Sequence, residues 1–593
     1  MIRKFLSLLV FVASVVPFAA AQSQIAKIDN EELSGTVSRL YDEVVMGGYL
    51  PLQVRLQNKT DRPQKWGLVA SSSIDENRGS VLDFSRQFEV PAKAMETFVV
   101  LVPTPSLVDF EAVRNQGYYY GYSSVTVRGR LVGPNEERTF NCYSSGKTDF
   151  DSLLSSLSGR NGVDIVGYGK QVKPFLPERY FEESKGYVPP HERYEIQLVE
   201  LQPTTMVADW RGYWGFGLIV LSTNELVSLN PLQLQALMNW VRAGGVLTLP
   251  DWSWSSRKGI QELERDDFER GVCFYGLGRV QVGPIAGGYS FVANEVGKEG
   301  SFPLNKQSVS GVLGYAFEEF ASAGGYYVVL MCFIVLVGPV NLMVFCRGRR
   351  RYRIFLTTPL IVVACLTLIG LYSLLRDGVG GEGERFRMSV FGGEANQALR
   401  IQSQGSQVGM IFDRSFEVPG KAHVERFFIP GGSRKRFEVE EGARGGDWFV
   451  SRSKNSHLIA WTESSREQIR LESSGAGGAV VVSSRVKGTL EPFVFKDKDE
   501  RYWYAESLSL GETKTLVPID AQEVKGHRTQ LAAGKAAKLY AKMMERQLRG
   551  KQVFFGELKN GPTPAWDTLG SVAWEDGGHL ALGRVVVSGK EGK

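Results

Sequence analysis

The stretch GLIVLSTNELVSLNPLQLQALMNWVRAGGVLTLP, residues 217–250, decides the fold that the sequence predicts. It opens with a nearly continuous apolar run, as expected for a parallel strand that is covered on both faces. A helix should follow, because Asn230 suits an N-cap, Pro231 suits the first helical position, and Gly244-Gly245 suits the stop. A second apolar run closes the stretch. Strand, helix and strand with short connections predict a βαβ unit in a doubly wound sheet.

β structure is predicted on both sides of this stretch. We expect a β-sandwich domain over residues 22–150, where the segment Tyr49–Asn58 alternates apolar and polar side chains. An α/β domain should occupy residues 151–310, and a β-rich domain residues 384–593. The motif F-E-V-P-x-K-A occurs at residues 88–94 and again at 416–422. It indicates either a sandwich module that is used twice or two Pro-turn hairpins that are alike by chance.

The beginning of the chain has the features of a secretory signal peptide. Arg3 and Lys4 precede a short apolar run, and Ala19-Ala20-Ala21 matches a cleavage site. We therefore predict a signal peptide over residues 1–21, with an uncleaved anchor as the alternative.

Two long apolar runs predict transmembrane helices at residues 326–346 and 354–375. The loop between them, 347–353, should be cytoplasmic by the positive-inside rule. Its topology-determining residues are Arg347, Arg349, Arg350, Arg351 and Arg353. This topology makes the lipid bilayer a partner and places both large regions outside the cytoplasm.

The central part of the chain resembles a known family. The segment Asp209-Trp-Arg-Gly-Tyr213, together with the stretch that begins at residue 217, resembles the class I glutamine-amidotransferase-like domain of predicted bacterial envelope proteins. Gly338-Pro339-Val340-Asn341, which runs into the arginine-rich loop, is similar to the membrane hairpin of the same proteins. The resemblance covers about residues 195–375. It implies a sandwich, a flavodoxin-like domain, a membrane hairpin and a β-rich tail in the bacterial cytoplasmic membrane, but no particular activity.

The chemistry of an amidotransferase is missing from the expected positions. Such an enzyme needs a Cys nucleophile on a strand–turn–helix elbow, with a His and an acid nearby. The residues after the two apolar runs, 222–225 and 251–254, contain no Cys, and Cys273 suits a buried position in a strand. We predict an inactive relative with no catalytic residue, no cofactor and no metal site. The sequence leaves open whether Cys142 and Cys273 form a disulfide.

Polar and aromatic residues cluster around the predicted strand ends. Ligands of open α/β sheets bind outside the carboxyl ends of the strands, so the two loops at 222–225 and 251–254 should share one edge. The predicted ligand- or partner-binding residues are Trp210, Tyr213, Trp214, Asn224, Glu225, Asp251, Trp252 and Trp254. The aromatic faces could stack on sugar rings or anchor a protein, or they could simply cap the core beneath the sandwich.

The charge balance argues against a nucleic-acid partner. The net charge is +5, and the two cations of the leader and the five arginines of residues 347–353 account for the whole excess. We therefore expect a non-catalytic, membrane-anchored envelope protein that binds a protein partner or a polysaccharide. A hydrolase or amidotransferase-like enzyme with a non-standard site in residues 151–310 is the alternative. A transport subunit is a weaker third possibility, because the two spans contain no acid or base.

Overall fold

Strands dominate the protein, because most apolar segments alternate with polar residues at the period of two that suits a half-buried strand. The structure is a computed structural model. It describes residues 24–44, 47–73, 80–105, 125–143, 167–174, 194–250, 252, 268, 271–283, 331–345, 352, 354–392, 396–426, 435–474, 479–531, 537–561 and 565–587. The predicted signal peptide and the five arginines of the predicted loop lie outside these residues.

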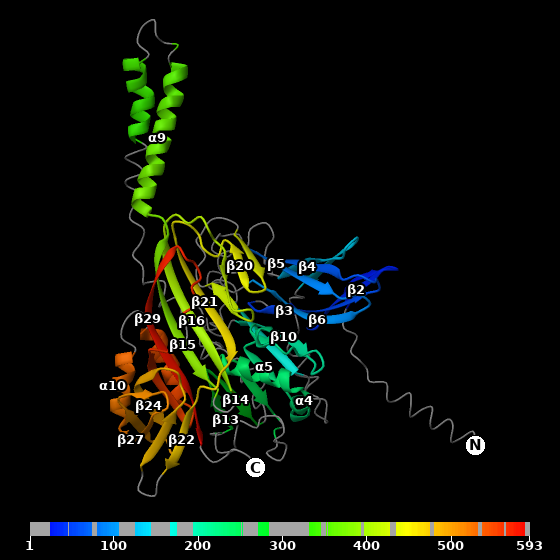
Figure 1. The fold of residues 1–593 in the computed structure, drawn as a ribbon, viewed down its shortest axis with the longest axis vertical. Coiled ribbons are helices and arrows are strands. Elements are labelled where there is room, and N and C mark those ends of the chain that lie inside the picture. The colour runs from blue at the N-terminus through cyan, green and yellow to red at the C-terminus, as the bar shows by residue number, and fades with distance from the viewer. Residues whose placement is uncertain are drawn as a thin grey trace, which may run out of the picture.

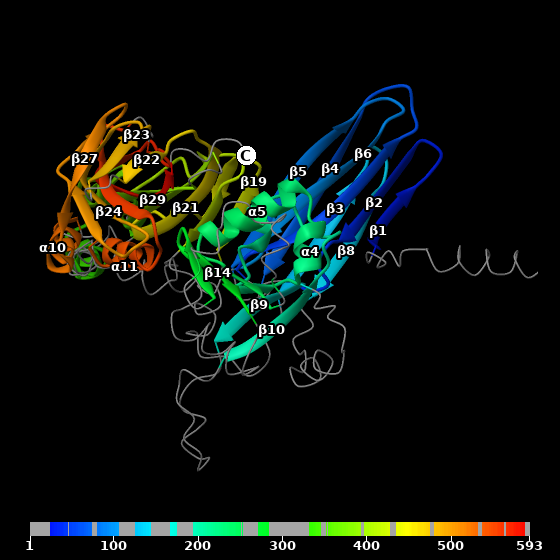
Figure 2. The same cartoon turned by 90° about the horizontal axis from the view of Figure 1, so that it is seen from below.

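Two sheets pack face to face in the N-terminal part of the protein and form a sandwich (Figures 1 and 2). The first, the partner sheet, has the order β1-β2-β3-β6 and is antiparallel throughout. Its strands are β1 (Gln24–Asp29), β2 (Leu33–Arg39), β3 (Tyr49–Asn58) and β6 (Met95–Pro103). The predicted strand Tyr49–Asn58 is confirmed, and its buried residues include Leu52, Val54 and Leu56.

The second sheet, the composite sheet, combines strands from two distant parts of the chain. Its order is β17-β20-β19-β5-β4-β7-β8. The N-terminal part supplies β4 (Gln64–Ser73), β5 (Val81–Val90), β7 (Thr126–Val132) and β8 (Glu137–Tyr143). The C-terminal part supplies β17 (Phe416–Glu417), β19 (Arg436–Glu440) and β20 (Ala443–Gly446). The join is a parallel pairing of β19 with β5, in which Phe437 lies opposite Leu82.

The two copies of F-E-V-P-x-K-A lie in this same composite sheet. The first copy ends β5 at Val90 and turns at Pro91, and the second contains β17 and turns at Pro419. They serve as two pieces of one sandwich rather than as the ends of two separate modules.

A mixed sheet with the order β10-β9-β11-β12-β14-β13 follows in the chain. Its strands are β9 (Gly167–Pro174), β10 (Tyr194–Leu201), β11 (Leu218–Val220), β12 (Val246–Leu249), β13 (Val272–Tyr275) and β14 (Gly278–Val282). Its helices are η3 (Trp210–Tyr213), α4 (Thr223–Ser228) and α5 (Pro231–Arg242). The predicted βαβ unit is confirmed, because β11 and β12 are parallel and α5 lies between them in the chain.

The predicted fold class is nevertheless wrong. A flavodoxin-like, doubly wound sheet would be largely parallel, but among the described strands of this mixed sheet only β11, β12 and β14 run parallel to one another. The hairpins β9–β10 and β13–β14 pair antiparallel on either side of them. The physical reason is the length of the connections: a tight turn at Gly276 joins β13 to β14 and leaves no room for a crossover helix.

The rest of the C-terminal part forms a large sheet with the main order β18-β21-β16-β15-β29-β22-β23-β27-β25-β24-β26, with β28 beside β24 and β29. The long central strands are β15 (Gly381–Phe391), β16 (Gln397–Val408), β21 (Ser453–Ser464) and β29 (Val572–Val587). The others are β18 (His423–Arg426), β22 (Ile469–Ser474), β23 (Val480–Ser484), β24 (Thr489–Lys496), β25 (Tyr502–Ala505), β26 (Leu508–Ser509), β27 (Thr513–Ile519) and β28 (Val553–Lys559). Helices α10 (Ala521–Leu531) and α11 (Ala537–Leu548) lie between β27 and β28 in the chain, and α11 packs on β28 and β29.

A helical hairpin projects away from the sheets (Figure 1). It consists of helical residues 331–345, which include the π-helix η6 (Leu336–Phe345), and of α9 (Ile354–Asp377). The buried amide of Asn341 ties the two arms together. Its Nδ2 donates to Thr358 Oγ1 at 2.9 Å, and its Oδ1 accepts from Thr357 Oγ1 at 2.7 Å.

The prediction of two transmembrane helices is wrong for the part of the chain that the structure describes. Among those residues, no helix combines the length and the apolar character that crossing a membrane requires. The predicted association with a lipid bilayer rested on those two helices.

Candidate functional site

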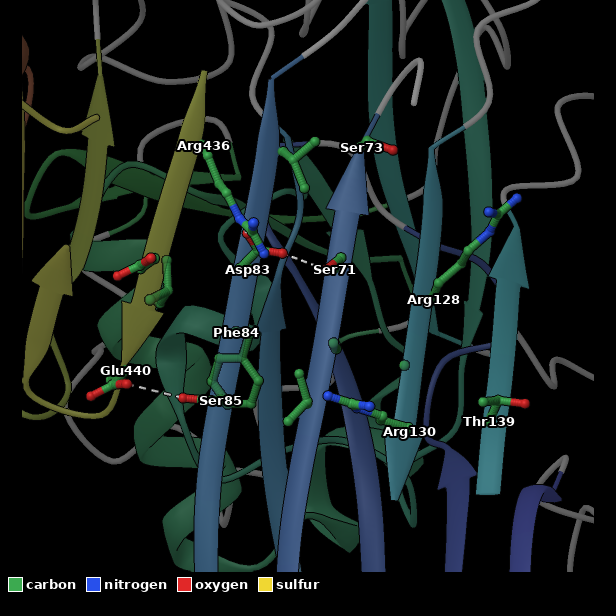
Figure 3. Close-up of a pocket in the computed structure, with 16 residues that line it drawn as sticks. Ser71, Ser73, Asp83, Phe84, Ser85, Arg128, Arg130, Thr139, Arg436 and Glu440 are labelled. Atoms are coloured by element: carbon green, nitrogen blue, oxygen red, sulfur yellow. Dashed lines mark hydrogen bonds and ion pairs between the residues drawn. The ribbon is translucent and has the colours of Figure 1, made fainter. Parts of the chain in front are cut away.

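An open groove lies on the outward face of the composite sheet. Its volume is about 1000 Å³, and it crosses β19, β5, β4, β7 and β8 (Figure 3). The residues that line it are Val69, Ala70, Ser71, Ser73, Val81, Asp83, Phe84, Ser85, Arg128, Gly129, Arg130, Thr139, Arg436, Glu438, Val439 and Glu440. We call this surface the sheet groove.

Strand alternation explains why polar side chains fill the sheet groove. Ser71, Asp83 and Arg128 point outward, and their chain neighbours Ala70, Phe84 and Val127 are buried in the sandwich core. Gly129 separates the two groove arginines of β7. A Cβ at Gly129 would come within 2.3 Å of the Phe140 ring, so a side chain there would displace the core packing beneath the groove.

One half of the sheet groove carries acidic side chains held in a hydrogen-bonded network. Asp83 accepts from Ser71 Oγ and forms an ion pair with Arg436 across the β5–β19 join. The bond to Asp83 raises the pKa of the Arg436 guanidinium above its usual value. At the same join, Ser85 Oγ donates to Glu440 Oε1 at 3.1 Å. Figure 3 marks the Ser85–Glu440 bond across the join and shows Arg436 of β19 extending to Asp83 of β5.

The other half of the sheet groove is cationic. Arg128 and Arg130 lie two residues apart on β7 and extend from the same face (Figure 3). Both side chains are exposed, and Arg130 Nη1 lies 3.5 Å from Glu137 Oε2 at the rim. Ion pairs this exposed are weak, so the guanidinium can exchange its partner for a ligand at little cost. Thr139 on β8 adds a hydroxyl beside them.

The side chains of the sheet groove can bind but offer little for nucleophilic chemistry. The described lining residues include no His and no Cys. The serine nearest to an acid, Ser71, donates a hydrogen bond to Asp83, whose carboxylate Arg436 also binds. Elsewhere in the described residues, no group of three or more His, Cys, Asp or Glu side chains has metal-binding geometry.

Three of the predicted site residues are buried in the core. Trp210, Tyr213 and Trp214 belong to η3 or follow it, and all are at most 5% exposed. Tyr213 Oη donates to the carbonyl of Val207 at 2.6 Å. The Trp214 ring packs on the ring of His423, with 4.1 Å between centroids. These aromatic residues therefore pack the mixed sheet against the sandwich and the large sheet.

Of the other predicted site residues, the structure describes Asn224, Glu225 and Trp252, which lie at or near the strand ends. The parallel pairing of β11 and β12 places residues 221 and 250 at one edge. The predicted loop 222–225 is in fact the start of α4, where Ser222 and Glu225 form a capping box, and Asn224 is exposed on that helix. Trp252 is half-buried against the core, while Asp251 and Trp254 lie outside the described residues. Ligand binding at this edge stays a prediction.

The structure contains two buried polar clusters that no pattern in the sequence predicts. In the first, His423 Nδ1 shares a hydrogen bond of 3.0 Å with Tyr49 Oη, and burial lowers the pKa of His423. In the second, Ser389 Oγ shares a hydrogen bond of 2.6 Å with His579 Nε2 and accepts from Arg400. Each cluster joins residues far apart in the chain. Cys142 and Cys273 are both buried, and no disulfide joins them.

Comparisons with known proteins add no identification. No protein-family model matches the sequence, and no curated protein shows a significant match. Among solved structures, red sea bream transglutaminase is 12% identical over 24% of this chain and 18% of its own, with a TM-score of 0.14. Spo0M, a sporulation control protein from Bacillus subtilis, is 11% identical over 23% of this chain and 57% of its own, with a TM-score of 0.12. The matched part spans less than two thirds of either protein, and scores this low carry no information on a shared fold.

Proposed function

We propose that this protein is a non-catalytic binding protein and that the sheet groove holds its ligand. The observation that carries the proposal is the groove itself: a hollow of about 1000 Å³ lined by polar side chains from five adjacent strands. Ligand clefts in proteins span roughly 300–1000 Å³, so the volume is at the upper end of that range.

The shape favours an extended ligand. Neighbouring strands lie about 4.8 Å apart, so the path from β19 across β5, β4 and β7 to β8 covers roughly 19 Å. A chain that crosses the strands meets a new row of hydrogen-bonding side chains at each step. We place this binding outside the cytoplasm because residues 1–21 have the features of a secretory signal peptide.

Site-specific photo-crosslinking tests the proposal. A photoreactive phenylalanine at position 139 puts the probe in the sheet groove, and the same residue at position 99 puts it on an exposed site of β6, outside the groove. In cells of the source organism, we expect a discrete adduct from position 139 that position 99 does not give. The same adducts from both positions, or none from position 139, would argue against a groove ligand.

A further inference from the structure

The two halves of the sheet groove differ in charge, and this difference restricts the ligand. Arg128 and Arg130 mark one half, while Asp83, Glu438 and Glu440 mark the other, where Arg436 pairs with Asp83. A ligand that fills the whole groove therefore needs anionic groups at one end and hydrogen-bond donors at the other.

The cationic half fits carboxylates. A guanidinium binds a carboxylate through two parallel N–H···O bonds, which is a geometry that Lys cannot provide. Residues two apart on a strand lie roughly 6.7 Å apart, so Arg128 and Arg130 can bind two separate carboxylates or grip one from both sides.

The acidic half selects against dense polyanions. Glu438 and Glu440 are exposed, and they repel a closely spaced series of phosphates or a polyacidic peptide. The same carboxylates accept hydrogen bonds from hydroxyl groups. Ser85 is positioned to add to these contacts through its own hydroxyl, which already reaches Glu440.

The sheet groove has no aromatic platform for neutral sugars. The aromatic ring among its described lining residues, Phe84, is only 6% exposed and packs in the sandwich core. Binding without stacking has to depend on charge and hydrogen bonds, and a neutral glycan supplies the hydrogen bonds but no charge for Arg128 and Arg130.

We infer, on the basis of the proposed function, that the ligand is an acidic polysaccharide. Its carboxylates bind Arg128 and Arg130, and its hydroxyl groups donate to Glu438 and Glu440. Each ring of such a polymer carries both kinds of group, so the chain can turn carboxylates toward Arg128 and Arg130 and hydroxyls toward Glu438 and Glu440.

Equilibrium binding to the full-length protein tests this ligand class. The probe is a fluorescently labelled oligomer of polygalacturonate, and the matched ligand is its methyl ester, which has the same backbone without the charge. The double variant Arg128→Gln/Arg130→Gln removes the cationic half. The control Arg55→Gln/Arg138→Gln removes the same charge from exposed arginines that do not line the groove.

We expect the wild-type protein to bind polygalacturonate at least tenfold more tightly than it binds the methyl ester. The Arg128→Gln/Arg130→Gln variant should bind polygalacturonate at least tenfold more weakly than wild type does. The control variant should stay within twofold of wild type. Glu438→Ala/Glu440→Ala should weaken polygalacturonate binding and strengthen binding of polyglutamate. If the loss of these acids strengthens both, attraction by charge alone explains the binding and the inference fails.

Other outcomes separate this inference from the proposed function. If polygalacturonate does not bind, or binds both arginine variants equally, while position 139 still gives its specific adduct, the groove binds a ligand of another class. If position 139 also gives no specific adduct, both proposals fail.

Discussion

His579 illustrates how a single buried residue makes stability depend on pH. It lies in the large sheet, where Ser389 Oγ contacts its Nε2 and Arg387 and Arg400 lie nearby. Burial, reinforced by these two arginines, lowers the pKa of His579 to about 3. Burial likewise lowers the pKa of His457 to about 4. Both rings are therefore neutral in the folded protein when the unfolded chain, with an ordinary pKa of about 6.5, already takes up protons.

The folded state should lose stability as pH falls below 6.5, because the unfolded state then binds more protons. Each such histidine should lower the free energy of unfolding by about 2 kcal/mol at pH 5 relative to pH 7. The variant His579→Gln should therefore lose about 2 kcal/mol less than wild type between pH 7 and pH 5, whatever its stability at pH 7. Urea unfolding at the two pH values measures this difference. His527→Gln is the control, since His527 stacks on Tyr504 outside both clusters. An unchanged pH slope in His579→Gln would contradict the prediction.

Helix α5 shows what local sequence signals can predict at the scale of one element. Asn230 is the N-cap, Pro231 starts the helix, and Asn230 and Gln233 form a capping box, as expected from their spacing. The structure adds a second role for Gln233. Its Nε2 donates to the carbonyls of Pro203 and Met206, at 3.0 and 2.7 Å, and so anchors the preceding segment to the helix.

We expect Asn230→Ala to cost about 1 kcal/mol, the usual value of an N-cap. Gln233→Ala should cost more, about 2 kcal/mol, because it also leaves buried carbonyl groups without their donor. Gln235→Ala, on the exposed face of the same helix, should change stability by less than about 0.5 kcal/mol. Denaturant unfolding of the three variants gives the ranking. Equal effects of Asn230→Ala and Gln233→Ala would mean that the contacts to Pro203 and Met206 contribute nothing.

At the scale of the whole molecule, the composite sheet makes distant parts of the chain depend on one another. β5 would be an open edge if β19 did not pair with it. The core of the sandwich likewise includes Phe416, Phe437 and Trp448 from the C-terminal part. The sandwich is therefore complete only when residues from both parts of the chain are present.

A fragment of residues 24–143 should aggregate or stay partly unfolded, because it exposes the edge of β5 and loses part of its core. Co-expression with residues 411–450 should recover a soluble complex. The same second fragment with Val439→Asp should not, because Val439 is buried opposite Phe84. Gel filtration and circular dichroism measure both results. A stable, monomeric fragment 24–143 would show that the sandwich is complete without β19.

Local features of this protein can be predicted from short segments of its sequence. The strand Tyr49–Asn58, the helix α5 with its caps, and the parallel pair β11–β12 all follow from apolar periodicity and capping residues close together in the chain. Apolar runs were weaker guides. The described parts of the two runs predicted to cross a membrane form the arms of the projecting helical hairpin, joined through Asn341, and no described helix has the length and apolar character of a membrane span.

The sheet groove, in contrast, depends on contacts between segments that are far apart in the sequence. Its acidic half exists because β19 pairs with β5 across more than 300 residues of chain, which brings Arg436 to Asp83 and Glu440 to Ser85. The role of the predicted aromatic residues likewise depends on the tertiary structure, because the Trp214 ring packs on the His423 ring in the core. Pairing between distant strands depends on which edges and apolar faces remain uncovered after the local elements form. That choice belongs to the folded molecule as a whole, and no local pattern of residues records it.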